Sequence, residues 1–213
     1  MKINYIDIYE YISKYYPIGI SEFDSQYFEY KGYNLLQELV YSKLEHFQHN
    51  EWKDFVEKAI KEHSQPLKAD GVSPMPDPSY TGSLLLLQEK TRNVIYSRKI
   101  VFHLSVIGPF YTIYGLDSIV IEDKIDQVLS FKPILYVSPC NIYESWFLLI
   151  RHQFEEVYPM HRFLPYSLLK ERVKSLSVAG ANVKNDQDAS IFQALFTSED
   201  VTNYKIKGND FYE

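Results

Sequence analysis

The chain has 213 residues, a formal net charge of −6, and globular proportions of hydrophobic (46%) and charged (23%) residues. These values exclude disorder over most of the chain, and the negative charge disfavours nucleic acid as a partner because it repels phosphate. A single cysteine excludes an internal disulfide framework and any zinc site built from several cysteines. The length suits one domain, which we expect to span residues 1–213.

Residues 1–64 are predicted to be helical, because apolar side chains recur there every three or four positions. The pattern is clearest between Tyr33 and Ile60 and changes face near His49. His46 and His49 stand three apart, a spacing that can bring two imidazoles to one metal ion. No third ligand accompanies them, so we expect an exposed polar pair and neither a metal nor another cofactor.

Residues 65–83 are predicted to form a long loop that joins the helices to a sheet. The stretch contains four prolines, at positions 66, 74, 76 and 78, and two glycines. Proline removes a backbone donor and fixes φ, so neither a helix nor a central strand persists through such a segment.

Residues 84–138 contain short apolar runs separated by turn residues, which predicts five or six strands. Gly115, Leu116 and Asp117 are predicted to form one of the turns. The spacing leaves no room for crossover helices, so neighbouring strands should form an antiparallel meander. Residues 100–106 place Ile, Phe, Leu and Val on one face, and we expect that face to meet the helices.

Residues 139–213 are predicted to hold the C-terminal helices and a charged tail. Helical periodicity runs from Asn141 to Pro159, a second helix is predicted over residues 166–176, and a brief strand near residues 204–206. The fold class is therefore α+β: an antiparallel meander with the N-terminal and C-terminal helices packed on one face.

His103 is the strongest candidate for chemistry, because it lies mid-strand beside Ser105 and close in sequence to Tyr111. Histidine titrates near neutral pH, so with a tyrosine on a concave sheet face it would suit acid–base catalysis on a small molecule. The competing interpretation is a histidine that is hydrogen-bonded within a partly buried sheet face. No nucleotide-binding, hydrolase or metalloprotease motif is present.

The aromatic content favours binding over catalysis. Aromatic residues make up 16% of the chain, with 19 Tyr, and such side chains are enriched at protein interfaces. We therefore expect a non-catalytic protein that binds another protein through acidic helices and Tyr-rich surface, which suits a basic partner. The candidate contacts are Glu51, Trp52, Asp54, Glu57, Tyr111 and Tyr114. The alternatives are an enzyme using His103 and a structural subunit of a homo-oligomer.

The overall profile is that of an acidic, tyrosine-rich chain without catalytic motifs. It resembles the profile of bacterial immunity proteins and other inhibitor-type binding proteins, which implies a protein target. The first residues contain no signal-peptide pattern, and no apolar run approaches ~20 residues. A cytoplasmic location without a membrane partner is the expectation.

Overall fold

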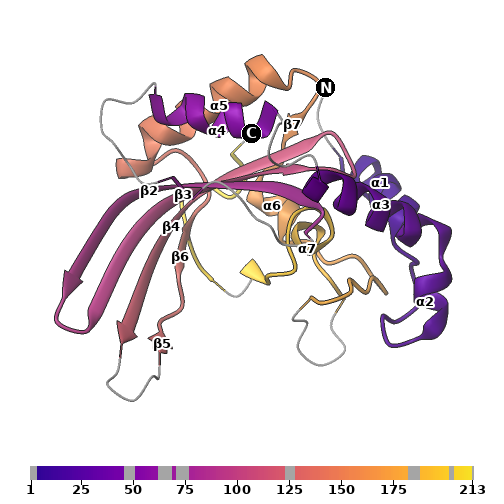
Figure 1. Cartoon of the computed structure of the whole chain (residues 1–213). Coiled ribbons are helices and arrows are strands. Elements are labelled where there is room, and N and C mark those ends of the chain that lie inside the picture. Colours follow the sequence, from indigo (N-terminus) through magenta and orange to yellow (C-terminus); the bar gives the residue numbers. More distant parts are fainter. Residues whose placement is uncertain are drawn as a thin grey trace.

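The computed structural model describes residues 4–45, 51–61, 69–70, 77–122, 128–181, 188–201 and 204–212. These residues form an α+β fold with a mostly antiparallel open sheet (Figure 1). Six strands form one hydrogen-bonded path in the order β1-β2-β3-β4-β6-β8, and two further short strands pair with β4. Because His46 and His49 lie outside the described residues, the structure does not bear on their predicted role.

Short strands surround three long ones. Among the described strands, β4 with β7 and β6 with β8 pair in parallel, and the other pairs are antiparallel. The strands are β1 (Ala69–Asp70), β2 (Ser79–Thr91), β3 (Val94–Ser105), β4 (Phe110–Glu122), β5 (Val128–Ser130), β6 (Ile134–Tyr136), β7 (Arg162–Phe163) and β8 (Lys205–Lys207).

The turn predicted at Gly115, Leu116 and Asp117 is wrong, because β4 runs through these residues as a strand. β3 likewise runs without a break through Ser97 and Arg98. These residue types are typical of turns, but contacts with residues distant in the sequence hold them within a strand here. A Cβ at Gly115 would lie 2.6 Å from atoms of the Tyr143 ring, so glycine is needed there for close packing.

The Pro-rich segment is also shorter than predicted. Ser79 to Ser83, expected in the loop of residues 65–83, belong to β2 and pair with Ser105 to Val101. Ala69–Asp70 forms the short edge strand β1. The remaining central part of the segment lies outside the described residues.

The outer edge of β4 is closed by three separate pieces of chain. β7 pairs with Phe110–Tyr111 in parallel, while β6 and β5 pair antiparallel with residues 115–117 and 120–122. The register shifts by one residue between β5 and β6. Pro133, which cannot donate to the ladder, lies at this shift.

Helices precede and follow the long strands of the sheet, and the short strands β7 and β8 lie between and after the C-terminal helices, respectively. The helices are α1 (Tyr5–Tyr15), α2 (Ser25–Glu29), α3 (Lys31–Glu45), α4 (Glu51–Lys61), α5 (Glu144–Val157), α6 (Tyr166–Leu169) and α7 (Ile191–Leu195), with a 3-10 turn at Asn141–Tyr143. The helix predicted over residues 166–176 ends early, at Leu169. The chain there turns to pair with a later segment, since Val173 N donates to Ala189 O at 3.0 Å.

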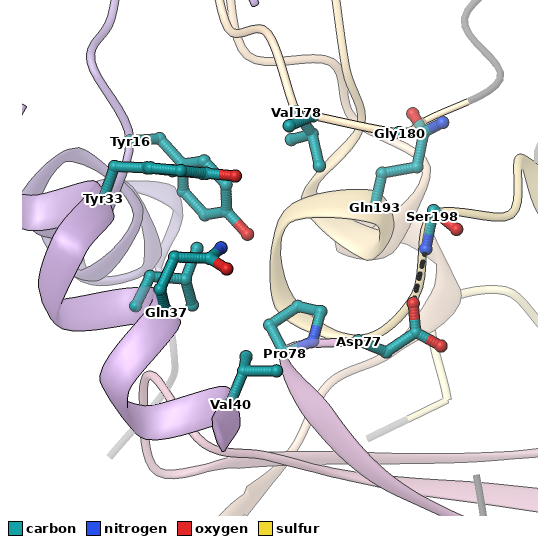
Figure 2. Close-up of a pocket in the computed structure, with 12 residues that line it drawn as sticks. Tyr16, Tyr33, Gln37, Val40, Asp77, Pro78, Val178, Gly180, Gln193 and Ser198 are labelled. Carbon is teal, nitrogen blue, oxygen red and sulfur yellow. Dashed lines mark hydrogen bonds between the residues drawn. The ribbon is translucent and has the colours of Figure 1, made fainter. Parts of the chain in front are cut away.

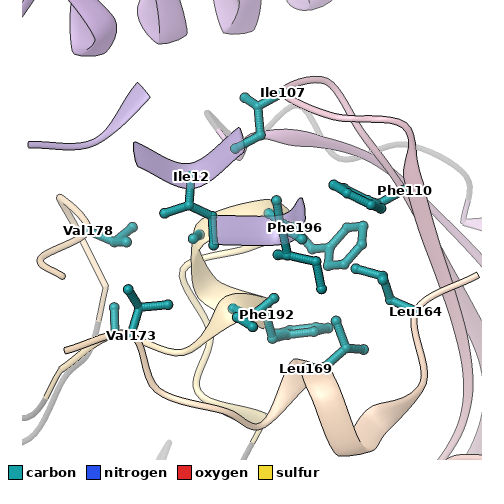
Figure 3. Close-up of a cluster of buried hydrophobic side chains, with 14 of the residues drawn as sticks. Ile12, Ile107, Phe110, Leu164, Leu169, Val173, Val178, Phe192 and Phe196 are labelled. Carbon is teal, nitrogen blue, oxygen red and sulfur yellow. The ribbon is translucent and has the colours of Figure 1, made fainter. Parts of the chain in front are cut away.

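Helices cover both faces of the sheet, which corrects the expectation that they pack on one face. One cluster, the α1/α7 core, joins α1, α3 and α7 to β3 and β4 through Val101 and Tyr114 (Figure 3). The other, the α4/α5 core, meets the sheet at Ile100, Phe102 and Ile113. Neighbouring residues of a strand point to opposite faces, so the cores lie on opposite sides of the sheet. Figure 1 shows α4 and α5 above the strands and α6 and α7 below them.

Beyond the two cores, β2, β3 and β4 continue as a projecting arm, defined here as residues 87–98 and 117–122 (Figure 1). Its tip is a two-residue turn in which Arg92 adopts a φ of 55° and Glu122 N donates to Asn93 O at 2.7 Å. An ion pair of 2.6 Å between Lys90 and Glu122 crosses the tip. The arm's aliphatic residues belong to neither core; they are Leu87, Val94, Ile95, Ile119, Val120 and Ile121.

Candidate functional surface

His103 is a core residue. Its side chain is 2% exposed and lies between the sheet and α7, with ring centroids 5.6 Å from Phe192 and 5.7 Å from Phe196. Nδ1 lies 2.9 Å from Thr81 Oγ1 and Nε2 lies 3.0 Å from Tyr114 Oη, so both ring nitrogens are hydrogen-bonded. Burial lowers the pKa of His103 to about 3. The imidazole is neutral near neutral pH and does not reach solvent, so a substrate cannot approach it in this structure.

Three of the predicted contact residues are buried, which corrects their assignment to a surface. Trp52, Tyr111 and Tyr114 are each at most 8% exposed. Trp52 and Tyr111 lie in the α4/α5 core, where both contact Phe154, at centroid distances of 6.1 and 4.3 Å. Tyr114 lies in the α1/α7 core. Tyr111 and Tyr114 lie on opposite faces of β4, and helices cover both faces there.

The acidic candidates lie on α4. Glu51 and Asp54 are exposed in its first turn, and Glu57 is partly exposed in the next turn. The helix is not acidic overall, because it carries Lys53, Lys58 and Lys61 as well. Carboxylates at its start and Lys58 in its second half complement the helix macrodipole, and this order stabilises α4 itself.

A tyrosine network at the base of the arm was not predicted from the sequence. Asp117 is 8% exposed and accepts hydrogen bonds from the hydroxyls of Tyr143, Tyr96 (3.1 Å) and Tyr136 (3.3 Å). Arg98 Nε lies 3.5 Å from Asp117 Oδ1 and also donates to the Tyr96 hydroxyl. The sequence signal was the single carboxylate within the apolar run of β4, which needs partners when it is buried.

The network raises the pKa of two of its phenols, Tyr143 and Tyr96, and orients their rings. Burial, and then the Asp117 carboxylate, raise the pKa of both Tyr143 and Tyr96. With its oxygens occupied by hydroxyl donors and a guanidinium, Asp117 serves as an acceptor that orients tyrosines. Tyr96 is therefore held by two charged neighbours while part of its side chain stays exposed.

An apolar surface lies on the side of the sheet that carries the tyrosine network. It consists of four arm residues, Val94, Tyr96, Ile119 and Ile121, together with Phe131, which follows β5, and we call it the arm face. Ile119 is 39% and Phe131 54% exposed, and Phe131 N donates to Ile119 O at 3.1 Å, so the two residues are neighbours. The sequence predicted these residues to be sheet residues, but it did not indicate that this end of the sheet lacks a helix in the described structure.

No group of three or more His, Cys, Asp or Glu side chains converges on a metal-sized site within the described ranges. Among the helices described, none is both long and apolar enough to cross a membrane. Comparison with protein-family models, curated proteins and solved structures finds no match for this chain. Function therefore has to be argued from the surface itself.

Proposed function

We propose that this protein is a non-catalytic binding protein that docks another protein on its arm face. The observation that carries the proposal is the pairing of exposed Ile119 and Phe131 on a strand surface outside both cores. Large apolar and aromatic side chains that gather on an exposed surface are typical of interaction sites. The proposal keeps protein binding but transfers the aromatic contacts from buried Trp52, Tyr111 and Tyr114 to this surface.

Tyr96 supports the proposal because it is ordered before a partner arrives. Its hydroxyl contacts Asp117 and Arg98, and the Arg98 guanidinium also lies 5.0 Å from the centre of its ring. A side chain that is already held loses little conformational entropy on binding. Tyrosine also combines a large apolar area with one polar group, which suits a contact residue.

Charge supports a basic protein as the partner. The chain carries a net charge of −6. The exposed carboxylates of Glu51 and Asp54 lie on α4, which packs on the same side of the sheet as the arm face. Carboxylates near an apolar surface accelerate association with a positively charged protein. This chemistry agrees with the resemblance to immunity and inhibitor-type proteins, and we place the protein in the cytoplasm, where its free Cys140 would stay reduced.

The test compares two aspartate substitutions of exposed phenylalanines. Phe131→Asp changes the arm face, and Phe23→Asp changes a residue that is 92% exposed on a different part of the chain. Immobilised wild type and both variants are incubated with lysate of the encoding organism, and bound proteins are identified by mass spectrometry. We expect a protein that the wild type and Phe23→Asp retain and that Phe131→Asp loses.

Equal capture by all three proteins would contradict the arm face as the binding surface. Light scattering on the purified proteins tests the homo-oligomer alternative with the same variants. A mass above that of one chain in the wild type, reduced only by Phe131→Asp, would make the partner a second copy of this chain. Matched melting temperatures would show that the substitutions act on binding and leave the fold intact.

A further inference from the structure

Residues 204–212, which we call the β8 segment, form a peripheral piece of the chain. β8 pairs in parallel with β6, and a backbone hydrogen bond of 3.0 Å from Val137 N to Lys207 O extends this pairing. Every residue of the segment is partly or fully exposed, and none is buried in either core. The segment is therefore bound at the surface, through its backbone and a few side chains.

The chain before this segment is buried, in contrast. The residues of α7 are at most 1% exposed, and Val201 is 1% exposed. Ser198 N donates a hydrogen bond of 3.2 Å to the Asp77 carboxylate at the wall of a cavity of about 190 Å³ (Figure 2). Burial therefore falls sharply between residues 201 and 204, and release of the β8 segment removes no fully buried side chain from either core.

The surface that holds the segment, which we call the receiving strip, favours a particular sequence. The strip comprises β6, Ser138, Phe147, Arg151, Phe163 and Lys170. Gly208 adopts a φ of 99°, and a Cβ there would lie 2.6 Å from Ser138 Oγ, so a residue other than glycine is disfavoured. Asn209 N, next in the chain, donates to the same Ser138 Oγ at 2.9 Å. The strip therefore holds the backbone of the segment close at a defined position.

Two side chains of the segment add specificity to these backbone contacts. The Asp210 carboxylate lies 2.8 Å from the Lys170 ammonium. The Tyr212 ring meets the Phe147 ring at a centroid distance of 5.6 Å, and the Arg151 guanidinium lies 5.3 Å from the centre of the Tyr212 ring. A cation at the face of an aromatic ring is attracted to it. The strip thus fits a strand that is followed by a glycine, a carboxylate and an aromatic ring, in that order.

We infer that the receiving strip binds the β8 segment of a second copy of this chain, so that two copies exchange these segments. The contacts described above join the segment to residues 134–170, so each can form between two copies as it does within one. Release of the segment leaves one edge of β6 unpaired, and such an edge is a template for another strand. A second copy supplies a strand with the required glycine, carboxylate and ring, so exchange replaces each contact by an identical one and costs little.

The experiment reverses the two charges of the ion pair on separate full-length chains. Lys170→Glu and Asp210→Lys each place like charges together within one chain, whereas a mixture of the two variants restores two opposite-charge pairs by exchange. Each exposed pair contributes little, but exchange turns two repulsions into two attractions. By sedimentation equilibrium we expect the two variants to associate with each other roughly tenfold more tightly than either associates with itself. The double variant Lys170→Glu/Asp210→Lys restores the pair within one chain and should associate no more than the wild type.

A second ion pair supplies the control for charge reversal itself. Lys58 and Glu156 lie 2.9 Å apart and join α4 to α5, outside the β8 segment, so mixed Lys58→Glu and Glu156→Lys variants should not associate. Equal association in both mixtures, or none in the Lys170→Glu and Asp210→Lys mixture, would overturn the inference. Phe131→Asp in both chains should leave the mixed pair intact, because the arm face is not involved. Segment exchange and partner docking on the arm face can therefore fail separately.

Discussion

His103 is a titratable residue that forms part of a hydrophobic core. Both ring nitrogens have hydrogen-bond partners, from β2 and β4, while two phenylalanines of α7 and its C-terminal end cover the ring. The imidazole, on β3, therefore links the neighbouring strands β2 and β4 by hydrogen bonds inside an apolar layer. Such a group is well accommodated only in its neutral form.

We predict that His103 makes the fold sensitive to acid. Its folded-state pKa is about 3 and its ordinary value 6.5, so the unfolded chain takes up the proton first as the pH falls below 6.5. Stability is then lost progressively down to about pH 3, by on the order of 5 kcal/mol. Urea unfolding of wild type and His103→Gln between about pH 7 and pH 4 should show a shallower pH dependence in the variant. Parallel curves would mean that other groups set the acid sensitivity.

Sequence patterns described the aromatic residues only in part. Strand alternation puts Tyr111 and Tyr114, three positions apart, on opposite faces of a strand, as they are in the structure. It could not show that both residues are covered, because coverage depends on where α5 and α7, which follow later in the chain, pack. Conversely, Ile119 and Phe131 have core-like side chains, and only the tertiary structure shows that they are exposed.

At the scale of elements, β4 shows why local turn chemistry misled the strand prediction. Glycine and aspartate are common in turns, so residues 115–117 resembled one. In the structure the Tyr143 ring packs against Gly115 and its hydroxyl donates to Asp117. The partner comes from a segment more than twenty positions later, and no local pattern records it.

We predict that Gly115→Ala destabilises the protein through this contact. The added Cβ would lie 2.6 Å from Tyr143 ring atoms, and overpacking of this kind costs about 1–3 kcal/mol. Chemical denaturation measures the change in unfolding free energy. In a Tyr143→Leu background the same substitution should cost clearly less, because the ring is gone. An equal cost in both backgrounds would instead place the strain in the backbone of β4.

At the scale of the whole molecule, the sequence predicted the α+β class and the presence of an antiparallel sheet. It did not predict which helices cover which face of that sheet. Short apolar runs with tight turns predicted a mostly antiparallel sheet between helical segments, and the structure has one. The positions of helices relative to the two faces depend on contacts such as Trp52 with Phe102 and Tyr16 with Ala194. Periodicity marks the apolar side of each helix but does not indicate which sheet face it meets.

The buried tyrosines predict a cooperative loss of structure in alkali. Burial raises the pKa of Tyr16, Tyr27 and Tyr114 above the ordinary value of 10, so these phenols stay protonated in the fold while the unfolded chain ionises. Each then removes about 1.4 kcal/mol of stability per pH unit above 10. Lys43, whose pKa burial lowers from 10.5 to about 8, acts in the opposite direction up to pH 10.5. Above pH 10.5, circular dichroism and tyrosinate absorbance should therefore change together. Gradual ionisation of the tyrosines without unfolding would contradict the prediction.

The divided edge of β4 has a consequence for synthesis on the ribosome. After β2, β3 and β4 have emerged, the sheet still presents unpaired amides and carbonyls along β4, and these can pair only when residues 128–136 and 162–163 have been synthesised. The outer edge of β6 stays unpaired for longer still, until residues 205–207 have been synthesised. During translation, the nascent sheet is therefore open to chaperones and to misassociation with other nascent chains.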